Sequence, residues 1–126
     1  MISYGFKKTV QMSVEAAEER ARELLKEHGF GVLTRIDMKE KLREKLGVDF
    51  RKYVILGACN PPNAYKAVQA EEDIGLLLPC NLIVYEKDEG AAVSAVRPSV
   101  SMQMIDNPKL AETAREVEAQ LQQVIE

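Results

Sequence analysis

The chain has no tryptophan, a single histidine and only two cysteines among its 126 residues. A structural zinc site usually takes four cysteine or histidine ligands in close pairs, so this composition does not favour one. No hydrophobic run is long enough to cross a bilayer. The alternating N-terminus also lacks the charged-then-apolar order of a signal peptide. We therefore expect a cytoplasmic protein with no membrane partner and with reduced cysteines.

Positive charge is scarce in the second part of the chain. Residues 1–52 carry 12 Lys and Arg against 9 Asp and Glu, whereas the remainder carries 5 against 11, and the net charge is −3. An acidic chain is a poor general binder of nucleic acid, so we expect no nucleic-acid partner. The cations between residues 39 and 52 alternate with acids, which is typical of a solvated helix face.

Hydrophobic periodicity predicts five strands and two long helices. The expected strands span residues 2–10, 30–36, 53–58, 82–87 and 91–97, and the last two form a hairpin. Long helices are expected from Val14, with Ser13 as N-cap, and from Pro108. Shorter helices are expected over residues 38–46 and 61–70, and residues 101–105 form either a loop or a short edge strand.

This order predicts a single two-layer α+β domain over residues 1–126, with a mostly antiparallel sheet and both long helices on one face. The uncovered face is expected to carry small and polar residues such as Ser3, Gly5, Thr9, Gly31 and Arg35. Such a face has to meet water, a ligand or another chain. We expect a homodimer, because isologous contact is the commonest form of oligomer.

Two segments that place a cysteine before an asparagine are the candidates for chemistry. Cys59 ends an apolar run, and Asn60 is expected to cap a helix that Pro61 begins. The dipole of that helix would favour the thiolate of Cys59. Cys80 and Asn81 follow a proline at the entry to the next strand. Because free cysteine is often a buried apolar filler, each thiol is also explained by packing alone.

The same segments, Gly57-Ala58-Cys59-Asn60-Pro61 and Ile74-Gly75-Leu76-Leu77-Leu78-Pro79-Cys80-Asn81, resemble the bacterial and archaeal family called domain of unknown function 302. The resemblance covers nearly the whole chain. It implies a single α+β domain with the TATA-binding-protein-like order β-α-β(4)-α. It implies no catalytic residue, cofactor or substrate, and a shared sheet arrangement says nothing about DNA.

Three hypotheses for function follow. In the first, a binding module holds a small sulfur-containing or apolar molecule, or a soft metal, near Cys59, Asn60, Cys80 and Asn81. In the second, the chain is a dimeric scaffold with structural cysteines. In the third, it is a thiol-dependent redox protein or enzyme that uses Cys59, with Cys80 as the resolving thiol. The third ranks last because no general base is identifiable beside the thiol. The only histidine, His28, is interpreted as a residue of a helix C-terminus.

Overall fold

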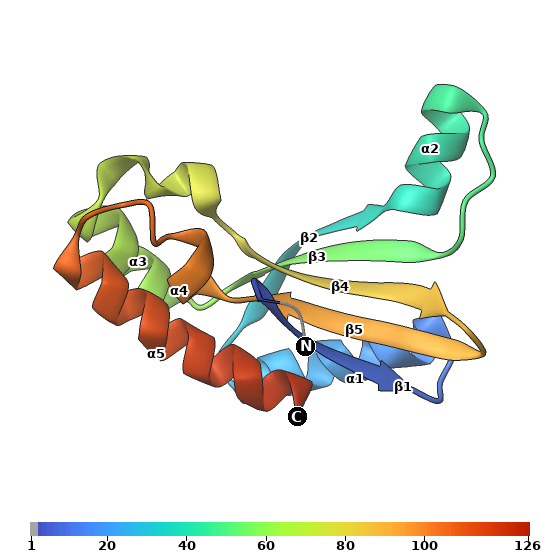
Figure 1. Ribbon diagram of the computed structural model, residues 1–126, viewed down its shortest axis with the longest axis horizontal. Coiled ribbons are helices and arrows are strands. Elements are labelled where there is room, and N and C mark those ends of the chain that lie inside the picture. Colours follow the sequence, from blue (N-terminus) through green and yellow to red (C-terminus); the bar gives the residue numbers. More distant parts are fainter. Residues whose placement is uncertain (1–2) are drawn as a thin grey trace.

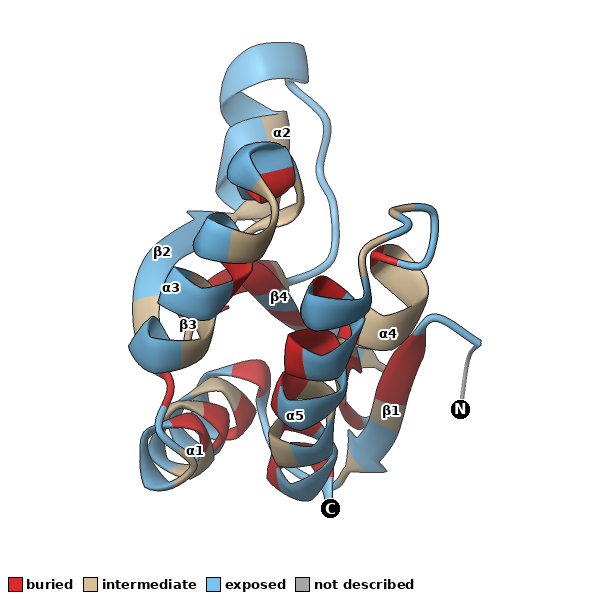
Figure 2. Ribbon diagram, turned by 90° about the vertical axis from the view of Figure 1, so that its left-hand side faces the viewer, coloured by how far each residue is buried: buried red, intermediate tan, exposed pale blue. Residues whose placement is uncertain are grey.

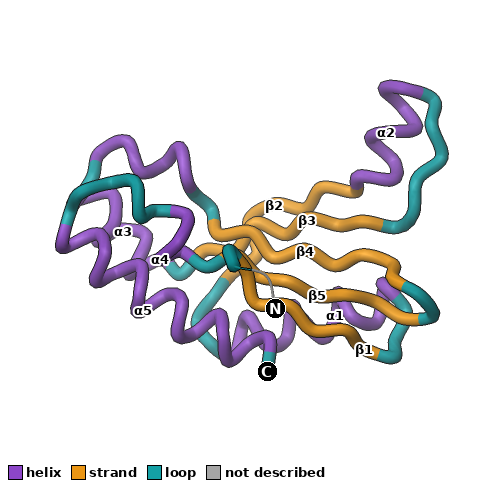
Figure 3. The backbone as a smooth tube through the Cα atoms, in the orientation of Figure 1, coloured by secondary structure: helices purple, strands orange, loops and turns teal. Residues whose placement is uncertain are grey.

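The computed structural model describes residues 3–126 as a five-stranded antiparallel sheet whose long helices lie on one side (Figure 1). The strand order is β1-β5-β4-β3-β2. The strands are β1 (Gly5–Val10), β2 (Gly31–Asp37), β3 (Tyr53–Cys59), β4 (Cys80–Lys87) and β5 (Gly90–Val96). The helices are α1 (Val14–Glu27), α2 (Met38–Leu46), α3 (Pro61–Ala70), α4 (Pro98–Ser101) and α5 (Pro108–Ile125), with a 3-10 helix η1 (Glu72–Leu77) before β4 (Figure 3). The expected two-layer α+β fold is confirmed.

The main core lies between the sheet and the two long helices, which run side by side beneath it (Figure 2). Three central strand residues, Leu56, Leu82 and Val84, are fully buried against them. The helices contribute apolar stripes at helical spacing: Val14, Ala17, Ala21 and Leu25 from α1, and Val117, Leu121, Val124 and Ile125 from α5. Each large aliphatic side chain buried here contributes about 1.5–3 kcal/mol, so this layer supplies most of the driving force for folding.

A second, smaller core forms where the N-terminal half of α5 meets α3, η1 and the turn after α4. Its buried members are Ala67, Ile74, Met102, Leu110 and Ala114. This cluster holds the segment between β3 and β4 against α5. It thereby fixes where that segment enters β4.

Four helices begin where the sequence indicated, because a side chain caps each one. Ser13 accepts the Ala16 N–H, Asp37 accepts the Glu40 N–H, Asn60 accepts the Asn63 N–H, and Asn107 accepts the Leu110 N–H. Each bond satisfies a backbone donor that has no partner inside the helix. No helix among residues 3–126 is long and apolar enough to cross a membrane.

The register of β2 changes at Leu33, and this overturns part of the sequence prediction. Val32 pairs with Ala58, and Thr34 pairs with Gly57, the neighbour of Ala58 on the antiparallel strand β3. Leu33 is therefore an extra residue in a bulge. The alternation expected from the sequence ran without interruption from residue 30 to residue 36. The bulge instead moves Thr34 to the face that α1 and α5 leave open.

Arg35 therefore does not lie on the uncovered face, where the sequence analysis placed it. It pairs with the inward-facing Leu56, and its side chain reaches α1, where its Nε lies 2.8 Å from Glu18 Oε2. Ile36 takes its place on the open face. The prediction was wrong because a bulge reverses the face of every residue that follows it in the strand.

Several strand boundaries also differ from the sequence prediction. Strand β4 begins at Cys80, two residues earlier than expected, because Cys80 pairs with Ala58. Of the two alternatives left open for residues 101–105, the loop is correct and the edge strand is not. The segment closes α4 and continues as a turn in which the Ile105 N–H donates to the Met102 carbonyl at 3.1 Å. Strand β1 begins at Gly5, and Ile2, which the sequence placed in it, lies outside the described residues.

Glu18 joins the edge of the sheet to α1, and its removal should destabilise the fold. It also pairs with Arg22 at 3.1 Å, and the hydrogen bond from Arg35 holds the pKa of its carboxyl below the ordinary value. We expect Glu18→Gln to lower the free energy of unfolding by about 1 kcal/mol at neutral pH. Because the pKa of Glu18 is depressed in the folded state, this contribution is complete above the ordinary carboxyl pKa and is lost as the pH falls from there through the lower, folded pKa.

Urea denaturation of wild type and variant at neutral pH and at about pH 3 measures the effect. The matched control is Glu19→Gln, which changes an exposed neighbour on the same helix. A destabilisation by Glu18→Gln that is equally large at both pH values would show that the ion pairs do not carry it.

Candidate functional site

An open pocket of about 280 Å³ lies where β3 ends and β4 begins, beside α3 and α5. Three of the four residues singled out in the sequence line it, namely Cys59, Asn60 and Cys80. Its other walls are apolar and come from distant parts of the chain: Phe30, Leu33, Ala58, Ala64, Leu78, Pro79 and Val117. The pocket therefore exists only in the folded chain, where the ends of two strands meet α5.

Asn60 fixes the start of α3 at the edge of this pocket. Its Oδ1 accepts the Asn63 N–H at 3.3 Å, and its backbone carbonyl accepts the Ala64 N–H at 2.8 Å. Its Nδ2 lies beside the turn that precedes β2, 3.4 Å from where a Cβ on Gly29 would stand. Gly29 has φ +84°, a conformation that glycine adopts without strain. The predicted role of Asn60 as N-cap is confirmed.

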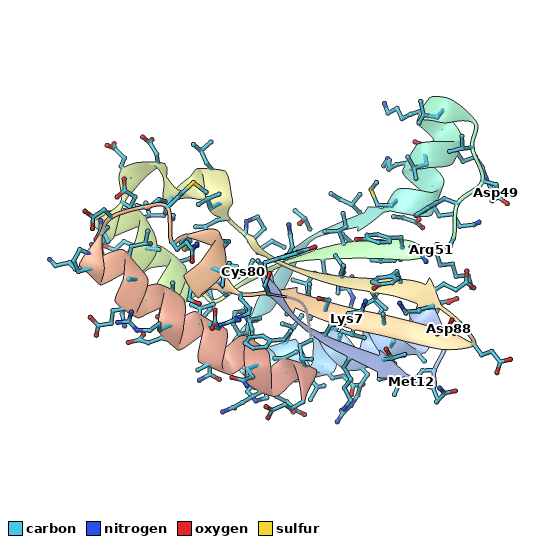
Figure 4. All side chains as sticks on the ribbon, viewed as in Figure 1. Lys7, Met12, Asp49, Arg51, Cys80 and Asp88 are labelled. Atoms are coloured by element: carbon cyan, nitrogen blue, oxygen red, sulfur yellow. The ribbon has the colours of Figure 1, made fainter. Side chains whose placement is uncertain are left out.

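Cys80 is the buried thiol of the site, with an exposed fraction of 8% (Figure 4). It pairs with Ala58, so its side chain points to the same side of the sheet as the main core. Burial raises the pKa of this thiol to about 11, and the neighbouring Cys59 adds to the rise. Cys80 is therefore protonated at neutral pH, and a protonated thiol is a poor nucleophile.

Cys59 is half-buried and is the last residue of β3. It pairs with Gly31 at the edge of the sheet and stands one residue before the cap of α3. Both cysteines are free thiols. Since Cys59 is the more exposed of the two, it is the thiol that a ligand or reagent can reach first.

Asn81 does not line this pocket. It pairs with Gly57, and its exposed side chain lies on the opposite face of the sheet from Cys80. It borders a neighbouring hollow of about 260 Å³ together with Leu76 and Val96. Cys80 lines both the pocket and this hollow, so the segment that contains Cys80 and Asn81 lies between the two.

Gly57 of β3 leaves room for the side chains of Thr34 and Pro79 beside the pocket. A Cβ at this position would stand 2.7 Å from Pro79 Cγ and would overlap Thr34 Oγ1. The contact lies on the open face, opposite the buried Cys80. Any larger residue at position 57 must therefore displace the proline that leads into Cys80.

Sequence reasoning did not find the apolar walls of the site. Phe30 and Val117 come from the segment before β2 and from α5, and both read as ordinary core residues. Only the folded structure shows that they border an open space. Leu33 gave a weak signal, since an apolar residue on the predicted polar side of a strand is unusual.

The described residues do not assemble a multidentate metal site. Within residues 3–126, no three His, Cys, Asp or Glu side chains come together as a set that could hold a metal ion. His28 caps the C-terminus of α1, where its Nδ1 donates to the Leu24 carbonyl at 2.8 Å. Cys59, Asn60 and Cys80 thus border a pocket whose other lining residues are apolar.

Comparison with known proteins places the chain in a family. The family model described as Domain of unknown function DUF302 matches residues 6–126. The chain belongs to this family. A crystal structure of an uncharacterized conserved DUF302 protein from Bacillus stearothermophilus is similar, with a TM-score of 0.91 and 33% sequence identity over 98% of this chain and 97% of that one. No curated protein matches the chain. The DUF302 fold is thus established here, whereas its chemistry has to be argued from the site.

The close approach at Gly57 predicts a strong effect of a single methyl group. We expect Gly57→Ala to lower the free energy of unfolding by about 2 kcal/mol, because Thr34 and Pro79 both have to move. Gly31→Ala is the matched control, since a Cβ at Gly31 meets no atom within 4 Å. Urea denaturation compares the two variants. Equal free energies of unfolding for Gly57→Ala and Gly31→Ala would show that Pro79 moves aside without loss of stability.

The raised pKa of Cys80 predicts a loss of stability at high pH. An unfolded thiol ionises near its ordinary pKa of 9.0, whereas the folded one stays neutral to about 11. The stability that the neutral thiol provides is thus complete below the first value and is lost as the pH rises towards the second. We expect the free energy of unfolding to fall more steeply in wild type than in Cys80→Ala over this interval.

Urea denaturation across the interval tests this expectation, because lysine and tyrosine titrate in both proteins and their effects cancel in the difference. Parallel pH profiles for wild type and Cys80→Ala would contradict the burial of this thiol.

Proposed function

We propose that the chain binds a small, mainly apolar molecule in the pocket at the strand ends. The observation that carries this proposal is that apolar residues from β3, α3 and α5 line one pocket together with Cys59, Asn60 and Cys80. Small-molecule sites are typically concave and apolar, with a few placed polar groups. A volume of about 280 Å³ is close to the lower limit of such sites, which favours a small ligand.

The polar groups suggest how a ligand would be oriented. Cys59, the more exposed thiol, and the Asn60 amide are available for weak polar contacts at the rim. Cys80 is neutral and polarisable, so it acts towards a ligand as an apolar sulfur. These properties suit an uncharged apolar or sulfur-containing molecule better than an anion.

A soft metal is less well supported. Two thiols can bind such an ion only as thiolates, and the raised pKa of Cys80 opposes the loss of its proton. The redox hypothesis meets the same obstacle, because thiol–disulfide exchange requires attack by a thiolate. In the scaffold hypothesis, the two sulfurs act by packing alone, and the pocket has no occupant.

Nuclear magnetic resonance of ¹⁵N-labelled protein titrated with toluene tests the proposal. We expect saturable shifts of the amide signals of Cys59, Ala64 and Val117. Ala64→Leu fills the pocket from the first turns of α3, so it should weaken toluene binding at least about tenfold. Ala111→Leu adds the same atoms to an exposed position of α5 and should leave binding unchanged.

Shifts confined to other parts of the chain would contradict the proposal, as would equal affinity of Ala64→Leu and wild type. Either result would favour the scaffold hypothesis. A Cys59→Ser variant in the same titration measures the share of binding that depends on the exposed sulfur.

A further inference from the structure

The sheet face that α1 and α5 leave open has an apolar centre. The strand register places Ile36, Ile55 and Ile83 side by side across β2, β3 and β4. All three remain partly exposed, and Ile36 has an exposed fraction of 41%. The small and polar residues expected on this face lie around the row, towards β1 and β5 and at Thr34, Gly57 and Asn81. An exposed row of three large aliphatic side chains is typical of an interaction surface.

A cluster of aromatic and cationic side chains adjoins this row on the side of α2. The rings of Tyr53 and Tyr85 stack at 5.3 Å between centroids. Lys7, labelled in Figure 4, lies on β1. Its Nζ lies 5.5 Å from the centroid of the Tyr85 ring, on the far side of β5. Arg51 lies 5.3 Å from the same ring. These contacts order the side chains of the open face before any partner binds.

Helix α2 extends from one end of this face and has no buried residue over its described length (Figure 1). A helix of nine residues is marginal in water without tertiary contacts. Its end and the following loop expose Leu46, Val48 and Phe50, and Leu46 is 69% exposed. The segment thus presents apolar groups that a second surface would cover.

The two ends of the open face carry opposite charge. Residues 38–52, which include α2, carry six Lys and Arg against three Asp and Glu, a net charge of +3. At the other end, Glu71 precedes η1 and Glu72 and Asp73 begin it, and residues 67–86 contain no Lys or Arg. Leu76 of η1 is 87% exposed beside these acids. Both ends rise on the same side of the sheet (Figure 1).

We propose that the open face binds a second copy of this chain, with α2 of each protomer lying against η1 of the other. A two-fold axis parallel to the sheet and across its strands brings the basic end of one protomer onto the acidic end of its partner. The same rotation makes this contact twice, so the assembly closes as a dimer. The isoleucine rows then meet at the centre, with the charged contacts at the rim. None of the contacts argued for this interface is a contact of the pocket, so the proposal holds whether or not the pocket binds a ligand.

Sedimentation velocity of the full chain at several concentrations measures the dimer directly. Lys41→Glu combined with Lys45→Glu should raise the dimer dissociation constant at least about tenfold, and so should Glu72→Lys combined with Asp73→Lys. A chain with all four substitutions exchanges the two signs. We expect it to recover the wild-type constant to within about threefold, because every opposed pair is restored.

The matched control is Glu19→Lys combined with Glu27→Lys, which makes the same charge change as the η1 pair on exposed positions of α1. It should leave the dissociation constant unchanged. Recovery in the fourfold variant would also show that the paired variants had not simply misfolded.

A wild-type chain that stays monomeric at submillimolar concentration would overturn the proposal and assign the face to a different partner. A dimer that is indifferent to both charge-reversed pairs would overturn it as well. Failure of the fourfold variant to recover, while circular dichroism shows it folded, would exclude the antiparallel contact of α2 with η1.

Discussion

The structure depends on one constraint: a five-stranded sheet receives its helical cover on one face only. The burial of Leu56, Leu82 and Val84 beneath α1 and α5 supplies the main core and fixes which side of each strand faces inward. The central strands are nevertheless apolar on both sides, as Ile55 and Ile83 show. The uncovered isoleucines are thus a direct consequence of one-sided cover, and they form the apolar centre of the face that we propose binds a second chain.

The pocket has its origin in the length of α5. Its C-terminal half packs Leu121 and Val124 into the main core, while its N-terminal half packs Leu110 and Ala114 against α3 and η1. Val117 lies between these halves, at the point where the helix leaves the sheet. At this point the ends of β3 and β4 do not pack against both the main core and the second core. The pocket bordered by Cys59 and Cys80 lies between the two cores.

Local interactions made the helix starts and the order of strands and helices predictable from the sequence. Caps such as Asn60 depend on residues three positions apart, and the order of strands and helices follows from periodicity. The bulge at Leu33 could not be foreseen, because the alternation of residues 30–36 continues through it and only the pairing with β3 breaks it. The positions of Cys59 and Cys80 at strand ends were readable in the same local way. The position of their apolar neighbour Val117 could not be predicted in this way, because tertiary packing brings α5 beside the strand ends.

The segment from Leu78 to Asn81 joins the two proposed binding surfaces. Leu78, Pro79 and Cys80 form walls of the pocket and also of the hollow on the open side, while Asn81 faces only the latter. Pro79 rests on Gly57, so the segment cannot move towards β3. A molecule in the pocket and a second chain on the open face would therefore contact opposite sides of the segment from Leu78 to Cys80. By thermodynamic linkage, if the ligand changes the dimer affinity by some factor, dimerisation changes the ligand affinity by the same factor. The strand entry at Cys80 is thus the place where ligand binding and dimerisation would be coupled.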